Sequence, residues 1–205
     1  MSIRAWLLAT CAILILASSA GTEENAPAKV VDRLDASLLD VLRQAETLGY
    51  QGRLDRLTPA LAEAFDLDFM AEKCLGRHWK DLDEQNRAQW LRTFRMLTLA
   101  NYAARSDRFS GQTFTRLGEE PGTSGTVLVR TKVTNPAAED VELSYRLRET
   151  NGRWKIIDVY LKGTVSELAL RRSEYSSVLE RDGFATLVST VDTKITDLAA
   201  GNFKR

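Results

Sequence analysis

VELSYRLRETNGRWKIIDVYL, residues 141–161, is the stretch that decides the fold. Apolar side chains occupy every second position from Val141 to Leu147 and alternate with polar ones, which is the period of a strand with one buried face. Asn151 and Gly152 then supply the positive φ angles that a two-residue hairpin turn requires. The return strand, 153–161, is apolar on both faces toward its end, so we expect it to be covered on more than one side.

Hydrophobic periodicity predicts further strands and helices on either side of this hairpin. Strands are expected at 112–117, 126–134, 141–150 and 153–161, and the short loops between them imply an antiparallel sheet of about four strands. Helices are expected from Val31 to near Gly49, from Thr58-Pro59 to Phe65, and at 68–76, 83–105, 165–181 and 184–198, the last two broken at Asp182-Gly183. Helices, then a meander, then helices again predict an α+β fold with helices packed on one face of the sheet.

The first twenty residues have the pattern of an export signal. Arg4 is the charged start, residues 5–17 are apolar, and small residues offer a cleavage site after Ala20. The alternative is a permanent membrane anchor, but spanning a bilayer needs roughly 20 apolar residues, and this run is shorter. We therefore expect a signal peptide at 1–20, a flexible leader at 21–29 and a single domain at 30–205.

Charge and cysteine content limit the possible functions. The chain has 28 basic and 28 acidic residues, and loss of residues 1–20 would remove only Arg4 from that balance. A near-neutral chain has no general attraction to nucleic acid or to an anionic membrane, and we expect neither as a partner. The same cut would remove Cys11 and leave Cys74 as the single thiol, so an exported form must be held together by its core, without an internal disulfide.

Few residues are candidates for catalysis. Cys74 and His78 are four residues apart and would share a helical face, the spacing at which a thiolate and an imidazole can interact. Gly76 weakens the helix between them, and a lone cysteine is most often buried. One His and one Cys do not make a zinc site, and the chain has no phosphate-loop or dinucleotide glycine pattern. We predict no catalytic residue, metal or cofactor, and keep a thiol-dependent acyl transferase as an alternative.

Large apolar and aromatic side chains are abundant in both the predicted helices and the predicted strands. Each of them, taken singly, is best explained as part of an ordinary core. Composition does not distinguish a filled core from a lined cavity, so an adaptor domain with a solid core stays open as a further alternative.

The segment GTVSELALRRSEYSSVLERDGF at 163–184, taken with the hairpin before it, resembles the MlaC (toluene-tolerance) superfamily of periplasmic lipid-binding proteins. It is most similar to the hopanoid-associated HpnM branch of that superfamily. The resemblance continues upstream through FDLDFMAEKCLGRHW at 65–79, EQNRAQWLRTFRMLTLANYAAR at 84–105 and FSGQTF at 109–114. A departure is KGTVS at 162–166, where phospholipid carriers more often have EGVS, and this favours a hopanoid or a related lipid over a phospholipid.

This resemblance implies an α+β domain of NTF2-like appearance that holds lipid tails in a cavity between its helices and its sheet. It further implies a soluble periplasmic carrier that shuttles a hopanoid or a related apolar lipid between an inner-membrane transporter and an outer-membrane acceptor, with a phospholipid as the alternative cargo. Combined with the periodicity, it predicts these lipid-binding residues: Phe69, Met70, Leu75, Trp79, Trp90, Phe94, Leu97, Tyr102, Val127, Val129, Val141, Leu143, Tyr145, Leu147, Val159, Leu168 and Tyr175.

A cavity for a lipid tail has to be deep. Burial is worth about 0.8 kcal/mol per methylene, so hiding a chain of ~16 carbons from water is worth on the order of 10 kcal/mol. Binding of that strength implies slow release, and delivery then needs a partner that opens the cavity. The helix expected from Val165, joined to the sheet at Gly163, is our predicted mobile lid.

Overall fold

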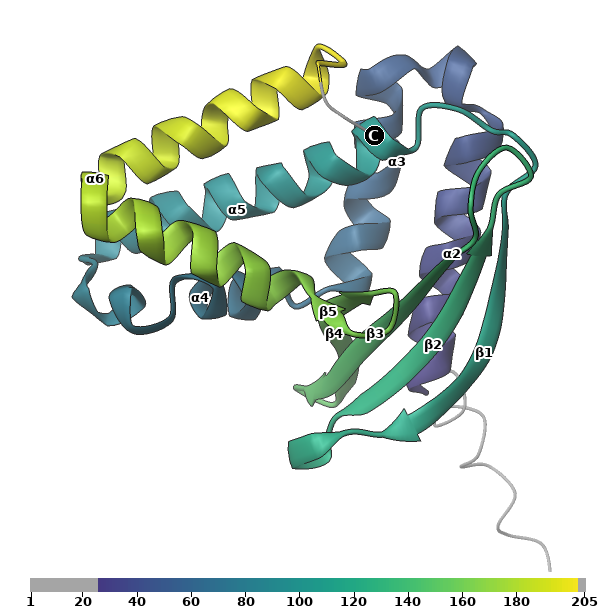
Figure 1. The fold of residues 1–205 in the computed structure, drawn as a ribbon, viewed down its shortest axis with the longest axis horizontal. Helices are drawn as coiled ribbons and strands as arrows, with labels where there is room; N and C mark the ends of the chain where they lie inside the picture. The colour runs from purple at the N-terminus through teal and green to yellow at the C-terminus, as the bar shows by residue number, and fades with distance from the viewer. Residues whose placement is uncertain (1–25, 203–205) are drawn as a thin grey trace, which may run out of the picture.

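The computed structural model describes residues 26–202, and it has one antiparallel sheet with the strands in chain order, β1 to β5. Figure 1 shows the long helices gathered against and beside this twisted sheet. The helices are α2 (Pro27–Arg43), α3 (Ala45–Ala64), α4 (Leu67–Leu75), α5 (Glu84–Arg105) and α6 (Glu167–Ala199), with short 3₁₀ helices η1 (Gly76–Asp81) and η2 (Thr123–Gly125). The strands are β1 (Thr113–Pro121), β2 (Val127–Thr134), β3 (Val141–Thr150), β4 (Arg153–Leu161) and β5 (Val165–Ser166). The predicted α+β class is confirmed.

The hairpin β3–β4 forms as the sequence predicts. Asn151 has φ 51° and Gly152 has φ 73°, so both turn residues adopt the left-handed backbone that a tight hairpin needs. Tyr145 of β3 pairs with Val159 of β4, and both are buried. We call the side of the sheet that carries them the inner face. The opposite face carries charged side chains such as Arg130, whose guanidinium donates to Glu142 at 2.7 and 2.9 Å.

The sheet has five strands, so the expected number of about four is corrected. The residues after β4 turn back through Lys162 and Gly163, both at positive φ, and the two residues of β5 then pair with β4. Pairing of β1 also continues to Pro121, although residues 119–122 were expected to be a loop. A bulge between Arg116 and Gly118 lets the edge strand continue, and an edge strand tolerates proline because one side of it needs no ladder hydrogen bond.

The first two helices differ from the prediction. Proline at the first helical position starts α2 at Pro27, so residues 27–29 of the predicted leader are helical; the signal peptide and the rest of the leader lie outside the described residues. The helix ends at Arg43 rather than near Gly49, and Gly49 instead kinks α3 with φ 60° and ψ −175°. The predicted helix start at Thr58-Pro59 is wrong. The hydroxyl of Thr58 donates to the Leu54 carbonyl of the preceding turn, and α3 continues through Pro59.

The helices next to the sheet begin at capping side chains. Asp66 accepts a hydrogen bond from the Phe69 backbone at the start of α4, and Asp83 accepts one from Asn86 at the start of α5. These caps explain why both helices begin within one residue of the predicted positions. Ser166 caps α6 in the same way, so this helix starts at Glu167 rather than at Val165.

Gly183 bends α6 into two arms, as the sequence predicts. Its φ of 82° and ψ of 176° lie in a region that only glycine occupies readily, so the helix cannot continue straight through it. In Figure 1 the two arms of α6 diverge from this bend, and α5 runs between them. We call residues 167–182 the first arm and residues 184–199 the second arm.

The core extends from the inner face of the sheet, on which α2, α3, α4 and α6 pack, to α5 and both arms of α6. Trp90 is completely buried, its indole N–H donates to the Ala71 carbonyl at 2.9 Å, and its ring packs edge-on against Tyr175 with centroids 5.2 Å apart. Leu75 and Leu97 are fully buried in the same cluster. Within residues 26–202, no helix combines the length and the apolar character needed to cross a lipid bilayer.

Candidate functional site

A cavity of about 160 Å³ lies between α4, α5, the start of α6 and the inner face of the sheet. Its walls are mostly apolar, and its few polar residues come from α5 and from the first turns of α6. The lining residues are Phe65, Met70, Phe94, Thr98, Asn101, Tyr102, Arg105, Leu143, Val159, Leu161, Glu167, Leu168 and Arg171.

Helix α5 contributes one continuous stripe to this cavity. Phe94, Thr98, Asn101 and Arg105 follow one another at steps of three or four residues, which places them on one side of the helix, and Tyr102 lies beside Asn101. The stripe changes from apolar at Phe94 to charged at Arg105, which follows the cavity from its interior to its mouth. The Tyr102 ring packs edge-on against Phe65 with centroids 5.7 Å apart, and this contact closes the wall toward α3.

The wall formed by α6 is attached to the sheet by the buried carboxylate of Asp158. One carboxylate oxygen accepts hydrogen bonds from the backbone of Leu168 at 3.1 Å and of Val159 at 2.8 Å. The other accepts the hydroxyl of Ser166 at 2.6 Å, and that same Ser166 oxygen accepts the backbone N–H of Ala169 at 2.9 Å. Asp158 is 5 % exposed, so water competes little with these bonds. We call this group the Asp158 anchor.

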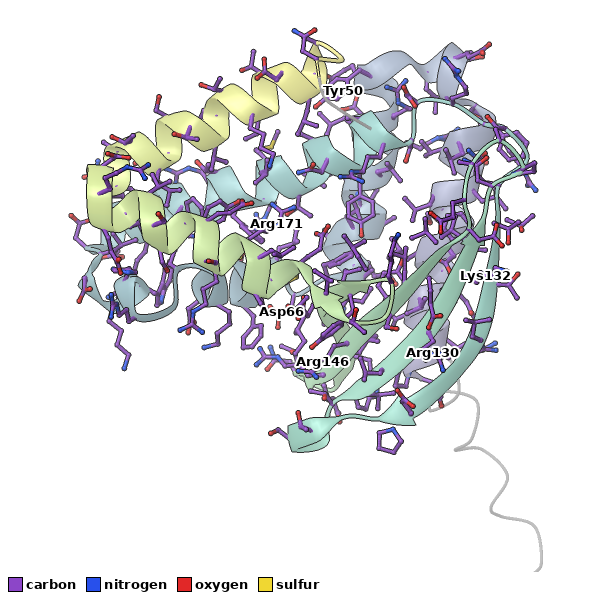
Figure 2. The ribbon with its side chains drawn as sticks, viewed as in Figure 1. Tyr50, Asp66, Arg130, Lys132, Arg146 and Arg171 are labelled. Atoms are coloured by element: carbon purple, nitrogen blue, oxygen red, sulfur yellow. The ribbon has the colours of Figure 1, made fainter. Side chains whose placement is uncertain are left out.

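The mouth of the cavity is polar. Arg171 belongs to the first arm and lies on the side of it that faces α5 (Figure 2). Its guanidinium is 3.6 Å from the Glu167 carboxylate and 3.4 Å from the Tyr175 hydroxyl. Asn101 and Arg105 face it from α5. Asn101, Arg105, Glu167 and Arg171 also border an adjoining hollow of about 310 Å³. This hollow reaches Lys194 and the second arm. The site therefore combines an apolar interior with a charged entrance, as a molecule with a long apolar part and a polar end would need.

The inner side of the sheet also buries polar groups. Burial, with a smaller contribution from the charge of Asp32, raises the pKa of Asp35 on α2 from 3.8 to about 7. Burial likewise raises the pKa of Tyr102 and of Tyr145 above the ordinary tyrosine value, and the charges of Asp35 and Glu167 add to both shifts. The two tyrosines therefore stay protonated at neutral pH, and Asp35 keeps its proton to a much higher pH than an exposed carboxyl would.

The structure brings six of the predicted lipid-binding residues together around the cavity. They are Met70, Phe94, Tyr102, Leu143, Val159 and Leu168. The other predicted residues are packed elsewhere. Leu75, Trp90, Leu97 and Tyr175 fill the space between α4, α5 and the first arm, and Val127, Val129, Tyr145 and Leu147 pack along the inner face of the sheet.

Three predicted residues lie farther from the cavity. Phe69 faces outward, where its ring contacts the Arg148 guanidinium at 3.7 Å and the Lys73 ammonium at 5.0 Å. Trp79 is on η1, and its ring lies under the guanidinium of Arg87 from α5. Val141 is half-buried at the start of β3. Consecutive side chains of a helix point about 100° apart, which is why Phe69 is outside while its neighbour Met70 is inside.

The predicted lipid-binding residues include none of the charged or amide side chains of the site. Asn101, Arg105, Glu167 and Arg171 all border the cavity, and Phe65, Thr98 and Leu161 line its apolar part. The spacing of the α5 stripe, with polar residues that continue an apolar face, was a signal that could have identified Asn101 and Arg105.

Cys74 is not placed for catalysis. It is fully buried, and burial raises the pKa of its thiol to about 12, so the nucleophilic thiolate is almost absent at neutral pH. His78 lies on η1, beyond the end of α4, and its Nε2 is 3.4 Å from the Glu180 carboxylate. This geometry argues against the acyl transferase alternative.

Comparison with known proteins identifies relatives by sequence family and by fold. Residues 32–193 match the family model described as MlaC protein. No curated protein matches the chain. Among solved structures, a phospholipid-binding protein from Ralstonia solanacearum, solved in complex with a phospholipid, matches with a TM-score of 0.71 and 23% identity over 85% of this chain and 98% of that one.

Proposed function

This chain belongs to the MlaC family, and on that premise we propose that it is a carrier that withdraws one lipid from a membrane protein, shields its apolar part and delivers it without covalent chemistry. The observation that carries the proposal is the cavity between α4, α5, α6 and the sheet, with apolar walls and a charged mouth. An adaptor domain would have no need for this void, because filling it would stabilise the fold.

The cargo enters with its apolar part inside and its polar end at the mouth. Phe94, Leu143 and Val159 form the part of the wall that would contact hydrocarbon, while Arg105 and Arg171 stand where a polar or anionic end would emerge. A hopanoid or related apolar lipid is the cargo that the HpnM-like segment favours. The phospholipid held by the Ralstonia solanacearum protein supports the alternative cargo equally well.

The cavity has to widen before a whole lipid fits. Its volume of about 160 Å³ is close to that of an engineered cavity of ~150 Å³ that holds a single benzene, whereas a lipid tail has many more carbons. The first arm is the wall that can move, because it joins the sheet through the turn at Gly163 and ends at the bend at Gly183. We infer that docking on an inner-membrane transporter or an outer-membrane acceptor in the periplasm moves this arm.

The cargo is identified by the lipids that the protein carries out of its cell. Protein purified without detergent from a hopanoid-producing bacterium is extracted with chloroform and methanol, and the extract is analysed by mass spectrometry. We expect about one lipid per protein, either a hopanoid or a phospholipid. Protein that repeatedly emerges empty and takes up neither lipid from vesicles would contradict the carrier function.

A pair of tryptophan substitutions tests whether the void itself is the binding site. Leu143 lines the cavity. Leu147, four residues further along the same face of β3, is fully buried in packed core. We expect Leu143→Trp to abolish lipid uptake with little loss of stability, and Leu147→Trp to lower the free energy of unfolding by about 1–3 kcal/mol through overpacking. Equal destabilisation by both, with lipid uptake kept in Leu143→Trp, would show that the cavity is not where the lipid lies.

A further inference from the structure

Three side-chain oxygens are buried on the inner side of the sheet without a hydrogen-bond partner among residues 26–202. They are Thr131 Oγ1 on β2, the Tyr145 hydroxyl on β3 and Asp35 Oδ1 on α2. Thr131 and Tyr145 are 0 % and 1 % exposed, so bulk water does not reach them. We call these three residues the inner polar group.

The strand register places Thr131 and Tyr145 beside the cavity, on the same face of the sheet as its lining residues. Thr131 pairs with Leu143, and Tyr145 pairs with Val159; both partners line the cavity. Because Val129 pairs with Tyr145, Thr131 and Tyr145 are diagonal neighbours on the same face of adjacent strands.

Asp35 approaches the same region from α2. It lies one turn from Val31 and Leu38, which are buried against the core, and α2 packs on β1, β2 and β4. Its charge contributes to the raised pKa of Tyr145 and also of Tyr102, whose side chain lines the cavity.

Leaving these oxygens unpaired is costly. A buried polar group without a partner destabilises the fold, and Val and Phe would fill the positions of Thr131 and Tyr145 without that penalty. Two unpaired oxygens on neighbouring strands, with a third on α2 close enough for its charge to act on Tyr145, therefore indicate a partner that the protein itself does not supply. A hydroxyl group fits all of them, because it can donate to Asp35 and accept from Tyr145 or Thr131.

We propose that the inner polar group binds a hydroxyl of the cargo lipid, so that the cargo class is an apolar lipid with a hydroxyl on the part that is buried. This inference rests on the proposed carrier function and narrows its cargo. A cargo that widens the cavity past Leu143 and Val159 reaches the inner polar group, whereas the unsubstituted tails of an ordinary phospholipid have nothing to offer it.

Two lipids that differ by one hydroxyl test the proposal. Lipid-free protein is incubated with vesicles containing equal amounts of diplopterol, a hopanoid alcohol, and diploptene, its alkene, with phosphatidylglycerol as the remaining lipid. Lipid retained by the protein after gel filtration is quantified by mass spectrometry. We expect wild type to retain the alcohol about 5-fold or more over the alkene, the ratio that one net hydrogen bond of ~1 kcal/mol provides.

Isosteric variants assign that preference to the inner polar group. Tyr145→Phe and Thr131→Val should bring the ratio of alcohol to alkene close to one and should raise the melting temperature of the lipid-free protein, because each removes an unpaired buried oxygen. Tyr50→Phe on α3 and Thr134→Val at the end of β2 are matched controls that should leave the ratio as in wild type.

The possible outcomes separate this proposal from the carrier function. Equal retention of alcohol and alkene by wild type, or retention of phosphatidylglycerol alone, overturns the hydroxyl site and leaves the carrier function intact. A lower melting temperature in Tyr145→Phe with an unchanged ratio shows that an ordered water is the missing partner, which also overturns it. Retention of none of the three lipids contradicts the carrier function itself.

Discussion

Asp35 links the stability of this protein to pH. Its carboxyl group is held on the buried side of α2, where the neutral form is favoured and the pKa rises from 3.8 to about 7. Below pH 4 the group is protonated in both the folded and the unfolded chain. Between about pH 4 and pH 7 the folded chain binds more protons than the unfolded chain, so stability falls as the pH rises through this window.

Asp35→Asn should remove this part of the pH dependence. Wild type should lose stability from pH 4 to pH 7, whereas the variant keeps a neutral side chain and should melt at a higher temperature than wild type at pH 8. Thermal unfolding followed by circular dichroism from pH 4 to pH 8 measures the difference. Asp40→Asn, an exposed residue on the same helix, is the control for the change in net charge. Parallel curves for wild type and Asp35→Asn would show that this carboxyl does not titrate with folding.

Single residues were predicted from the sequence where strand alternation determines the direction of a side chain. Leu143, Tyr145 and Leu147 all face inward as expected, because a period of two leaves no other choice. Alternation did not reveal that only Leu143 of these three borders a void. Helical spacing likewise does not reveal that Asp35 is buried enough to raise its pKa to about 7, because a carboxyl on the polar side of an amphipathic helix is normally solvated.

Helix α6 is fixed at its start by the sheet more than by its own sequence. The Asp158 anchor joins β4 to the first turn of α6, and Ser166 serves both as the helix cap and as a donor to Asp158. Near the other end of the first arm, Arg77 and His78 of η1 both approach Glu180. The arm is therefore attached near its two ends; its first turns cover the cavity, and its middle, at Tyr175, packs on the core.

Ser166→Ala should loosen the start of α6. Loss of a serine cap costs about 0.5–2 kcal/mol, and the Asp158 carboxylate loses its shortest hydrogen bond at the same time. We expect a lower melting temperature and faster amide hydrogen exchange at residues 166–170. Ser173→Ala, an exposed position inside the same helix, should be neutral or slightly stabilising. Protection at 166–170 that matches wild type would mean that packing alone holds the arm.

Elements were predicted well where a local signal has one meaning. Asp83 begins α5, Asn151-Gly152 forms the hairpin turn, and Gly183 breaks the last helix, because each side chain acts on its own backbone. The prediction failed at Thr58-Pro59, which is also a valid helix start, because packing of α3 on α2 and α5 overrides the local preference. The two residues of β5 are too few to produce a periodic pattern.

At the scale of the whole molecule, segments far apart in the sequence form the cavity. Residues from α4, α5, β3, β4 and α6 meet there, and none of these elements encloses a void by itself. On the proposed carrier function, a bound lipid would act as an additional core component. Binding of the lipid to the folded chain alone stabilises it by mass action, by about 2.7 kcal/mol when the free lipid is at 100 times its dissociation constant.

Removal of the lipid should lower the melting temperature of the whole protein. For a chain of this size, 1 kcal/mol corresponds to roughly 2–4 °C, so lipid at saturating concentration should raise the midpoint by about 5–10 °C over delipidated protein. Differential scanning calorimetry with and without added lipid measures this shift. Leu143→Trp should show no shift, and a shift of equal size in that variant would mean that the lipid binds outside the cavity.

The sequence predicted the layers of the molecule but not the void between them. A filled core and a lined cavity need the same apolar residues, so periodicity could not separate them, and the expectation of a cavity came from the resemblance to a family of lipid carriers. The predicted lipid-binding residues did not include the charged mouth, because they were chosen for apolar character, and polar side chains on a helix usually belong to a solvated face.

The buried Cys74 thiol can report transient opening of the helices around it. Its sulfur lies in the cluster between α4, α5 and α6, with no exposed surface and with a thiol that stays protonated. A thiol reagent can reach it only when those helices separate, so the rate of modification under native conditions counts these openings. The same molecule with lipid bound should be modified more slowly, and the ratio of the two rates gives the amount by which bound lipid raises the free energy of separating the helices.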